Sequence, residues 1–480
     1  MLALLLPLIA SAGVPDMYGT GARAMGMGMG GVGYIDDGNA ARSNPAGLGF
    51  LRQPTVGLGL SSAMHHFDEL PPVYWDTDRD GVVDERDTPL QLPGVEDANG
   101  FHMYAGRNVG GKFGLGVNAY IPTTRLIRFA TFEPTLPNYF MYSNRPQRFS
   151  AAAGVGGKVL PGVSIGAALE ILAAAKVDVW MTLDATVSGD ASAPILSDVR
   201  ITTHEISLDV RAASAPILGL QLDVGEWFAG LKGLQLGAVY RGTSGLPVDV
   251  NLDIQANVHL EDVGDLDPYI LGLVLSSKLN LLDHYLPSYV ALGVAWRSDR
   301  VFSAYADARF TRWTGFTLDA AHVDEASSHV HAPLVGLDDI LVDGHNQGEP
   351  VLRNTVELRV GTELTMPRRE VKGRARYLEL SLRGGVALFP SPLVSQPDAT
   401  ALLDTNRTAF TLGLGLEHWD PFELVDAPVR YDLFAQVHLL ANDRLAHSAD
   451  TPTAGFPVQG DSLPIGGDIV VLGGQWGFDF

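Results

Sequence analysis

The sequence predicts an all-β protein: a 14-stranded antiparallel transmembrane β-barrel with an N-terminal hatch inside its lumen. Three observations predict this class. Apolar and polar residues alternate along segments of about ten residues, which is the period of a strand. Short and long breaks alternate between these segments, as periplasmic turns and external loops do in such barrels. The final segment carries aromatic residues on one face, which suits the border between membrane and water.

The composition agrees with this class and disfavours others. Gly accounts for 54 of the 480 residues, and each interior Gly destabilises a helix by about 1 kcal/mol relative to Ala, which disfavours a helical bundle. Lys and Arg number 33 against 55 Asp and Glu, and the resulting net charge of −22 disfavours a nucleic-acid partner. The absence of Cys excludes a disulfide framework, a thiolate metal site and a Cys nucleophile.

Residues 1–12 are typical of a secretory signal peptide. The apolar run from Leu2 to Ala10 leads into the small residues Ala10, Ser11 and Ala12, which fit a cleavage site. The usual basic residues before the run are missing, so a buried N-terminal segment is the alternative. No other uninterrupted apolar run approaches the ~20 residues of a spanning helix. We therefore expect an exported chain without a helical membrane anchor.

Residues 13–50 form the predicted hatch. They are rich in Gly and Met and show no alternation. The run Gly26–Gly31 lacks the preceding strand and the Lys-Ser/Thr pair of a phosphate-binding loop. Gly permits a compact irregular backbone, and such backbone is tolerated at membrane depth only where protein buries it or water reaches it. A position inside the barrel satisfies this condition.

Residues 51–480 form the predicted barrel, and the first long external loop covers 68–99. Short breaks near 109–112, 158–162, 297–300, 366–376 and 418–428 alternate with long ones near 68–99, 124–147, 243–286, 314–352, 390–406 and 442–466. The strands are expected at 54–66, 100–108, 113–123, 148–157, 163–180, 205–218, 233–242, 287–297, 301–313, 353–365, 377–389, 407–417, 429–441 and 468–480. The even count is typical of bacterial single-chain barrels. The pattern leaves the bounds of the fifth and sixth strands open.

The parity of each strand separates a lipid face from a lumen face. Val356, Leu358 and Val360 alternate with Glu357 and Arg359, for example. A charge on the lipid face near the membrane midplane would cost about 2–4 kcal/mol, so the charged parity is assigned to the lumen. There we expect an ion-pair network, or contacts with the hatch, from Asp307, Arg309, Glu357, Arg359, Glu363, Glu379, Arg383, Arg430 and Asp432.

The C-terminal segment predicts the last strand of such a barrel. Trp476, Phe478 and Phe480 alternate with Gln475, Gly477 and Asp479, so a strand places the rings on one face. A soluble edge strand is the alternative, but it gives no reason for a terminal Phe.

The hatch segment resembles a known family. Its sequence GARAMGMGMGGVGYIDDGNAARSNPAGLGF contains the pair Asp36 and Asp37, followed by the motif Asn44, Pro45, Ala46, Gly47 and Leu48. This is similar to the N-terminal hatch of the FadL family, outer-membrane transporters of long-chain fatty acids and other hydrophobic compounds. Residues 113–123, 286–316 and 389–419 resemble further parts of that family. The Asn-Pro-Ala-Gly-Leu motif also occurs in other outer-membrane families, including scaffold proteins of secretion systems.

The resemblance implies how such a barrel works. Family members capture a ligand in an external groove, pass it to an internal pocket and release it sideways into the membrane where the third strand kinks inward. In this chain the third strand offers Gly114, Gly116 and Asn118 as candidates for the lateral opening. A Gly can mark a bend in a strand; plain lipid-facing glycines are the alternative.

An apolar stretch at 269–286 is the candidate for the external groove. Ile270, Leu271, Leu273 and Leu275 belong to a run of aliphatic residues at roughly helical spacing. An external loop this apolar covers something or binds something. The resemblance implies binding, and a helix packed on the barrel rim is the alternative.

The first external loop carries the ligand spacing of a Ca²⁺ site. Counted from Asp76, carboxylates of Asp76, Asp78, Asp80, Asp84 and Asp87 fall at positions 1, 3, 5, 9 and 12, with Gly81 at position 6 and the carbonyl of Val82 at position 7. The segment resembles thrombospondin type 3 and dockerin-like repeats. We expect a structural Ca²⁺ ion that folds the loop or bridges to lipopolysaccharide; a solvated acidic loop is the alternative.

These observations predict a function in transport rather than catalysis. Ser and His are scattered, with no spacing that singles out a catalytic set. The preferred interpretation is uptake of hydrophobic molecules, such as long-chain fatty acids or hydrocarbons, across the outer membrane of a Gram-negative bacterium. A scaffold for secretion or surface attachment and a general porin for polar solutes are the alternatives.

Overall fold

The computed structural model describes residues 18–75, 83–85, 87–90, 94–123, 136–142, 149–188, 195–261, 269–298, 301–316, 322–323, 329–332, 337–341, 350–366, 369–371, 376–396, 401–419, 428–446 and 462–479. The predicted signal peptide lies outside these residues.

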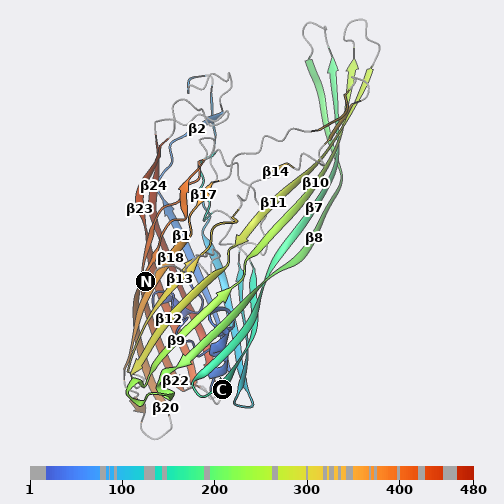
Figure 1. Ribbon diagram of the computed structural model, residues 1–480. Coiled ribbons are helices and arrows are strands. Elements are labelled where there is room, and N and C mark those ends of the chain that lie inside the picture. The colour runs from blue at the N-terminus through green and yellow to red at the C-terminus, as the bar shows by residue number, and fades with distance from the viewer. Residues whose placement is uncertain are drawn as a thin grey trace, which may run out of the picture.

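Fourteen antiparallel strands close into a barrel (Figure 1). In ring order they are β1 (Thr55–Phe67), β4 (Ala98–Val109), β5 (Phe113–Pro122), β6 (Ser150–Leu160), β7 (Val163–Ser188), β8 (Ile195–Asp223), β9 (Leu234–Arg241), β12 (Tyr289–Ser298), β13 (Phe302–Thr311), β18 (Thr355–Thr365), β20 (Arg376–Phe389), β22 (Arg407–Trp419), β23 (Pro428–Ala446) and β24 (Ser462–Asp479). The ring closes where β1 pairs with β24 from Thr55↔Asp479 to Phe67↔Gly467. The predicted all-β class, the closed antiparallel barrel and the strand number are confirmed.

The two ends of the barrel differ. At one end, which we call the short-turn end, Gly110 and Gly111 connect β4 to β5 and Gly162 lies in the turn from β6 to β7. All three have positive φ, between 64° and 75°, which Gly adopts without the penalty a Cβ brings. The opposite, long-loop end carries the connections that the sequence predicted to be long.

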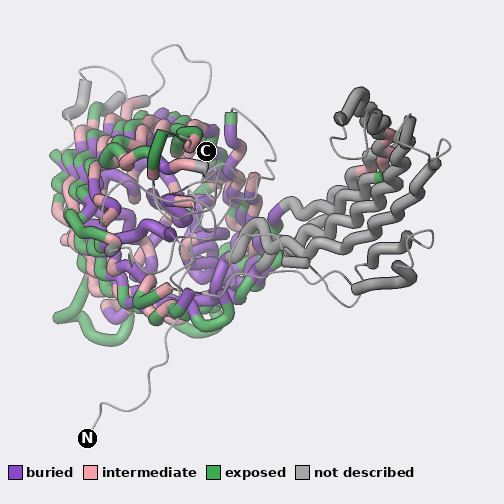
Figure 2. Tube along the Cα trace, turned by 90° about the horizontal axis from the view of Figure 1, so that it is seen from above, coloured by how far each residue is buried: buried purple, intermediate pink, exposed green. Residues whose placement is uncertain are grey.

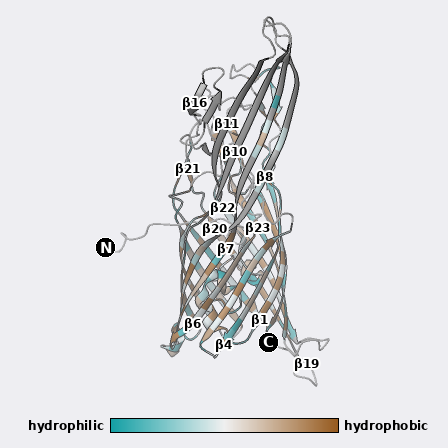
Figure 3. Cartoon of the chain, turned by 90° about the vertical axis from the view of Figure 1, so that its right-hand side faces the viewer, coloured by the Kyte–Doolittle hydropathy of each residue, from teal (hydrophilic) through white to brown (hydrophobic). Residues whose placement is uncertain are grey.

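The outer face of the barrel is an apolar belt. Leu58, Leu115, Leu358, Leu412 and Leu433 come from five strands and are between 46% and 69% exposed. Figure 3 shows hydrophobic residues distributed along the wall strands. A soluble protein rarely exposes so much contiguous apolar surface, whereas lipid requires it. None of the helices in the described part of the chain is long and apolar enough to cross a membrane.

Aromatic residues of the last strand lie on this outer face near the short-turn end. Trp476 is 48% exposed, and its ring stacks against that of Tyr431 with 6.4 Å between centroids. Phe478 lies 5.0 Å from Trp476, centroid to centroid. The predicted aromatic face of the C-terminal strand is therefore confirmed for Trp476 and Phe478.

Two strands of the long-loop end were not anticipated. β10 (Ser244–Glu261) and β11 (Tyr269–Leu286) pair with each other, and β10 runs parallel to the far half of β7. β7 and β8 are also longer than predicted, so that four strands project beyond the barrel (Figure 1). The helical spacing proposed for 269–286 is wrong, because these residues form the strand β11 and pair with β10. Leu271, Leu273 and Leu275 also fit the period of two of a strand.

The remaining strands and short helices lie in the connections. They are β2 (Val73–Trp75), β3 (Thr88–Leu90), β14 (His322–Val323), β15 (His329–Ala332), β16 (Leu337–Leu341), β17 (Val351–Leu352), β19 (Arg369–Val371), β21 (Leu393–Ser395), η2 (Val224–Glu226) and η3 (Ala229–Leu231).

Residues 18–50, which we call the inner segment, lie within the ring of strands. The segment contains α2 (Ala22–Met25), α3 (Ala40–Ser43) and η1 (Pro45–Phe50), joined by irregular backbone. Tyr18, Ala22 and Leu48 are fully buried. Figure 2 looks down the barrel and shows buried residues inside the ring and exposed ones around it.

Candidate ligand path inside the barrel

A row of glycines on the inner wall receives the Asn44–Leu48 motif. Gly114, Gly156, Gly166 and Gly219 lie side by side on four neighbouring strands, β5 to β8, because each pairs directly with the next. A Cβ on any of them would lie under 3.0 Å from an atom of residues 44–48. Only Gly lets the backbone of the inner segment approach the wall this closely.

Glycines of the other strands continue this close fit around the ring. Each lies against a backbone stretch of the inner segment, where an added Cβ would come within 3.0 Å of it. These residues are Gly237 and Gly293 against residues 32–33, and Gly361, Gly385 and Gly413 against residues 26–28. Many glycines of this Gly-rich chain therefore lie where the wall contacts the inner segment.

Asn44 joins its motif to the wall. Its buried amide Nδ2 donates to the carbonyl of Val32 at 2.8 Å and to that of Leu220 on β8 at 3.2 Å. Its Oδ1 accepts the backbone N–H of Ala46 at 3.2 Å and so caps η1. One side chain therefore fixes two stretches of the inner segment and one wall strand.

Wall side chains also satisfy backbone N–H groups of the inner segment. Asp307 on β13 accepts from Gly31 at 2.8 Å and from Val32 at 3.1 Å. The Tyr305 hydroxyl accepts from Gly30 at 3.0 Å, and Thr411 Oγ1 accepts from Gly28 at 2.7 Å. Irregular backbone can be buried here because the wall supplies the acceptors that a helix or sheet would otherwise provide.

The charged residues that were predicted to face the lumen form an ion-pair network. Arg23 of the inner segment holds both oxygens of Glu363, at 2.6 and 3.0 Å, and Asp36 at 2.9 Å. Arg383 also binds Glu363 at 2.6 Å and contacts Asp432 as well. The network was predicted from strand parity alone, and the structure confirms that these wall charges face the lumen.

A second buried cluster centres on Glu170 of β7. Its side chain is fully buried and forms ion pairs with Arg42 of the inner segment and with Arg241 of β9. An unpaired carboxylate at this depth would be strongly destabilising. Arg241 compensates its charge from a wall strand, and Arg42 joins the inner segment to the wall on this side. This cluster was not predicted, because the pattern left the bounds of the strand that contains Glu170 open.

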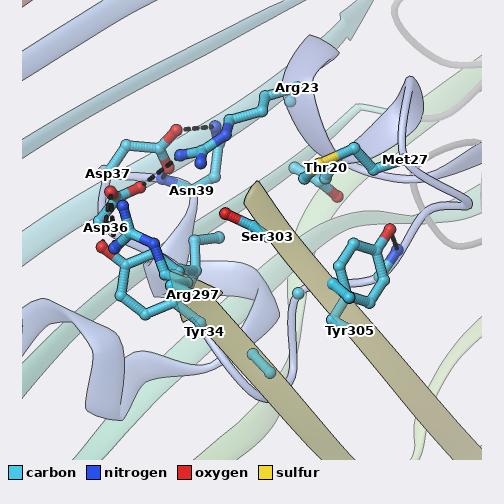
Figure 4. A pocket seen from close by; sticks show the side chains of 17 residues that line it. Thr20, Arg23, Met27, Tyr34, Asp36, Asp37, Asn39, Arg297, Ser303 and Tyr305 are labelled. Atoms are coloured by element: carbon cyan, nitrogen blue, oxygen red, sulfur yellow. Dashed lines mark hydrogen bonds and ion pairs between the residues drawn. The ribbon is translucent and has the colours of Figure 1, made fainter. Parts of the chain in front are cut away.

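One lumenal cavity lies between the inner segment and strands β12 and β13. It has an empty volume of about 590 Å³. Figure 4 shows Arg23, Asp36 and Arg297 grouped on one side, with Tyr305 on the other. The Arg297 guanidinium lies 4.2 Å from the centroid of the Tyr34 ring, and the Tyr34 hydroxyl donates to Asp36 at 2.7 Å. Ala24, Met27, Ile35, Ala295 and Ala304 supply an apolar lining.

The acidic pair of the hatch motif titrates asymmetrically. Burial alone would raise the pKa of Asp36, but the guanidinium groups of Arg23 and Arg297 outweigh it and hold that pKa well below its usual value. Burial and the nearby Asp36 charge raise the pKa of Asp37 to about 6. Asp37 instead accepts hydrogen bonds from the backbone and side-chain amides of Asn39, at 2.9 and 3.2 Å.

Two further cavities lie deeper toward the long-loop end. One, of about 520 Å³, is lined by Tyr289, Asp307 and Arg309 of the wall. It shares Thr20 and Gly30 with the cavity beside β12 and β13. The other, of about 230 Å³, also contacts Thr20 and lies beside β4 and β5. The cavities therefore adjoin one another around Thr20, and together they trace a path beside the inner segment.

Aromatic and aliphatic side chains close the long-loop end of the lumen. This outer cluster comprises Tyr18, Tyr139, Phe140, Tyr142, Trp313, Phe316, Leu402 and Leu403, packed against the ends of β1, β23 and β24. The rings of Phe67 and Tyr139 stack with 4.2 Å between centroids. A mouth lined this way binds apolar molecules more readily than ions.

Arg407 lies beneath the outer cluster without a counter-ion in the described residues. It is 6% exposed, and its guanidinium packs 4.3 Å from the centroid of the Phe389 ring. Its Nε and Nη1 are buried and have no hydrogen-bond partner in the described part of the chain. A desolvated, unpaired cation is unfavourable, which suits a site for an anionic group. The sequence could have indicated this residue, because the alternation along its strand places Arg407 among the residues that face the lumen.

The candidates for a lateral opening on β5 face inward. A Cβ on Gly114 or Gly116 would meet Leu48, and Asn118 Nδ2 donates to Asn39 Oδ1 at 2.8 Å. The alternative of lipid-facing glycines is therefore wrong. β5 pairs without a register shift with β4 and with β6 from Phe113 to Tyr120, so the wall is continuous at these residues.

Two other predicted sites fall largely outside the described structure. The side chains of Ile270, Leu271, Leu273 and Leu275 are not described, although their backbone belongs to β11. Asp76, Asp78, Asp80 and Val82 lie outside the described residues, while the backbone N–H of Asp84 donates to Asp87 Oδ2 at 3.0 Å. The described residues alone contain no group of carboxylates or imidazoles placed to hold a metal ion.

The closed ring, the apolar belt and the charged lumen define a transmembrane β-barrel of the outer-membrane type. Its fold is that of a FadL homologue from Pseudomonas aeruginosa, with a TM-score of 0.53, 15% identical residues and 99% of both chains covered. The toluene transporter TodX of Pseudomonas putida is more distant, at a TM-score of 0.47 and 12% identity over 99% of this chain and 100% of that one. No protein-family model and no curated protein sequence matches the chain. The fold implied by the FadL resemblance is confirmed.

Proposed function

We propose that this protein is a FadL-type transporter that takes up hydrophobic molecules, such as long-chain fatty acids, through the outer membrane of a Gram-negative bacterium. Residues 18–50 act as its hatch. The observation that carries the proposal is the state of the lumen: the inner segment fits against glycines of nine wall strands and is fixed by buried ion pairs. A general porin needs a water-filled channel, and a lumen so occupied argues against one.

The ligand chemistry follows from the lining of the path. The outer cluster is aromatic and aliphatic, and Arg407 lies directly beneath it. An apolar body with an anionic end satisfies both features. Such a molecule gains about 0.8 kcal/mol per CH₂ on entering the bilayer, so uptake is passive and downhill and needs no enzymatic step. The solved relatives support the class, since one is a FadL homologue and another a toluene transporter.

Uptake of radiolabelled oleate by a Gram-negative strain that lacks its own transporter tests the proposal. Asn44→Ala is the informative variant, because it removes the side chain that ties the motif to β8. Asn442→Ala, on an exposed part of β23, is the matched control. We expect uptake above the empty vector, lowered by Asn44→Ala only. Absence of uptake of oleate and toluene by a folded, surface-exposed barrel would refute transport.

A scaffold for surface attachment is the second candidate. The observation that favours it is the sheet of β8, β7, β10 and β11, which projects beyond the barrel. A scaffold predicts that deletion of the projecting half of these strands abolishes attachment and leaves the barrel folded. A transporter predicts that the hatch variant impairs uptake whether or not the projection is present.

We also propose a structural Ca²⁺ ion in the loop of Asp76, Asp78, Asp80, Val82, Asp84 and Asp87. The support is the spacing of hard oxygen ligands in the sequence. Trp75 directly precedes Asp76, so Tb³⁺ luminescence excited through Trp75 reports binding on the whole protein, and Ca²⁺ competes for it. Asp80→Asn should weaken the signal, whereas Glu69→Gln, exposed in the same loop, should not. A Tb³⁺ signal that Ca²⁺ cannot displace would count against the site.

A further inference from the structure

The sheet that projects beyond the barrel has one covered edge and one open edge. Its strands lie in the order β11, β10, β7 and β8 (Figure 1). β14 and β15 pair with the side of β11 that faces away from β10. β9 pairs with β8 only over Ile217–Asp223, and none of the described strands pairs with that side of β8 over residues 198–211. A strand edge of this length is a template for pairing with another strand.

A β-bulge decides which positions of this edge share a face. β8 pairs with β7 as Thr203↔Met181 and Glu205↔Trp180, so His204 is the extra residue of the bulge. Neighbouring positions of β7 lie on opposite faces of the sheet, and so do their partners on β8. Even positions before the bulge therefore share a face with odd positions after it.

This shift gives each face of the edge a uniform character. The positions of one face are occupied by Asp198, Arg200, Thr202, Glu205, Ser207, Asp209 and Arg211. The positions of the other face are occupied by Val199, Ile201, Thr203, Ile206, Leu208 and Val210. Without the bulge, polar and aliphatic residues would be mixed on both faces, because a slip of one residue exchanges the faces of a strand.

The charged positions are self-complementary in an antiparallel pair of two β8 strands. If the pair is centred just after His204, Asp198 of one copy lies opposite Arg211 of the other. In the same register Arg200 lies opposite Asp209. A twofold axis through the centre forms each pair twice, and opposite charges at opposed positions stabilise a pair of strands. On the other face this register opposes Val199 to Val210 and Ile201 to Leu208.

The same charges disfavour the neighbouring registers. A shift of two residues preserves the faces but places Arg200 opposite Arg211 in one direction. In the other direction it places Asp198 opposite Asp209. Like charges at opposed positions destabilise a pair of strands. The distribution of charge along the edge therefore specifies one register, and the partner that matches it is the same edge.

We propose that β8 of this protein pairs edge to edge with β8 of a second copy, antiparallel over residues 198–211. Main-chain hydrogen bonds hold the two strands together, and the opposed charges set the register. The pairing goes beyond the proposed transport and does not depend on it. It gives the attachment function, the second candidate, a partner: another copy of this chain.

The direction of β8 decides where the second copy lies. β8 runs from the projection into the ring, where its pairing with β9 begins at Ile217. An antiparallel partner strand runs the other way, so its barrel lies at the opposite end of the ladder. At about 3.3 Å per residue, about 40 Å of strand separates Ile217 of each copy from the centre of the pair. The two barrels therefore lie in two membranes that face each other, and the pairing joins one cell surface to another.

Reversal of single charges tests the register. Arg200→Asp opposes two carboxylates across the pair, and Asp209→Arg opposes two guanidinium groups, so each variant alone loses self-pairing. A mixture of the two variants restores opposite charges between unlike copies. Arg444→Asp is the matched control, because Arg444 is an exposed charge at the long-loop end of β23.

The measurement uses the full chain in outer-membrane vesicles shed by a Gram-negative host with truncated lipopolysaccharide, which keep the native orientation. Vesicles labelled with two dyes are mixed, and their clustering is read as coincidence of the two colours. We expect clustering of wild-type and Arg444→Asp vesicles, and a several-fold loss for Arg200→Asp or Asp209→Arg vesicles alone. Recovery is expected when vesicles of these two variants are mixed, and it also shows that both variants are folded.

Each other outcome overturns the pairing. Wild-type vesicles that cluster no more than empty-vector vesicles exclude it. Undiminished clustering of the single variants places the contact elsewhere, and mixed variants that are folded by heat-dependent gel mobility but do not recover exclude this register. Oleate uptake by the same cells is a separate readout: clustering without uptake supports the pairing and refutes transport, whereas uptake without clustering does the reverse.

Discussion

At the scale of single residues, two adjacent glycines of β20 differ sharply in what surrounds them. A Cβ on Gly385 would lie under 3.0 Å from the backbone of Gly28, whereas the nearest atom to one on Gly384 is Thr411 O at 3.7 Å. We expect Gly385→Ala to displace the inner segment and to destabilise the protein by about 1–3 kcal/mol, the usual range for overpacking. Gly384→Ala is the matched control.

The measurement is thermal unfolding in detergent micelles, with ion conductance across planar bilayers as the second readout. Displacement of the inner segment should lower the midpoint temperature and raise the conductance of Gly385→Ala alone. Equal behaviour of the two variants would show that the inner segment does not depend on the close fit at this glycine.

Asp37 makes a pH-dependent contribution of its own. Its pKa is about 6 in the folded protein and about 4 in an unfolded chain, so the folded state binds the proton more tightly. The stabilisation is complete below about pH 4 and is lost as the pH rises through about 6, up to about 3 kcal/mol. We expect the wild type to lose thermal stability between pH 5 and pH 8 relative to Asp37→Asn.

Unfolding midpoints of both proteins across this pH range measure the difference, with Asp443→Asn on an exposed part of β23 as the control for removal of a charge. A constant difference between wild type and Asp37→Asn from pH 5 to pH 8 would mean that Asp37 stays ionised in the folded protein. The neighbouring Asp36 acts in the opposite sense and at lower pH, because Arg23 and Arg297 hold its pKa down.

At the scale of elements, wall strands could be predicted from the sequence. The alternation of apolar and polar residues indicates which side chains face lipid and which face the lumen, and it indicates the approximate length of each strand. The strand expected at 407–417 is observed as Arg407–Trp419, and its charged or polar parity faces the lumen as predicted. β10 was missed for a different reason. Val250, Leu252 and Ile254 alternate with polar residues, but a period of two does not reveal whether a strand joins the ring or runs parallel to β7 above it.

The site was predictable only where a local motif defines it. Asn44 and its neighbours could be assigned to the inner segment from the sequence. The glycine row from Gly114 to Gly219 could not, because it depends on the exact register of four neighbouring strands. The same holds for Glu170, since its partners Arg42 and Arg241 come from segments that are distant in the sequence.

Two loops of the outer cluster are joined to each other, and we expect that ligand entry separates them. The Asn138 N–H donates to Ala401 O at 3.1 Å, and the Leu403 N–H donates to Asn138 O at 2.8 Å. Paired positions such as Asn138 and Leu402 bring Cα atoms into the range of a disulfide, about 4.4–6.8 Å. We expect Asn138→Cys with Leu402→Cys to take up oleate when reduced and far more slowly when oxidised.

Uptake with and without reductant measures this, and each single Cys variant controls for the substitutions themselves. Equal uptake by the oxidised and reduced double variant would mean that ligand enters without separation of these loops. Because the chain has no natural Cys, the engineered pair is the only one that can form.

At the scale of the whole molecule, the arrangement favours apolar solutes over ions. The outer face is an apolar belt, the long-loop end is closed by an aromatic cluster, and the lumen contains an inner segment held by ion pairs. An ion that crosses would have to displace these contacts, whereas the proposed transport of a hydrophobic molecule would use the apolar lining beside them. The barrier to ions and the path for hydrophobic molecules therefore both depend on the placement of residues 18–50.

This gives a final prediction that combines two measurements on one preparation. The purified full chain, inserted in planar bilayers, should show little steady ion conductance, and the same protein in vesicles should equilibrate oleate downhill without an energy source. Steady conductance in the wild type would indicate a porin, since the inner segment would then leave a continuous water path. If the protein shows neither ion conductance nor oleate movement, the scaffold function is favoured. The strands that project beyond the barrel would then be its functional part. Movement of oleate without ions is the result that only a hatch-filled barrel with a hydrophobic exit explains.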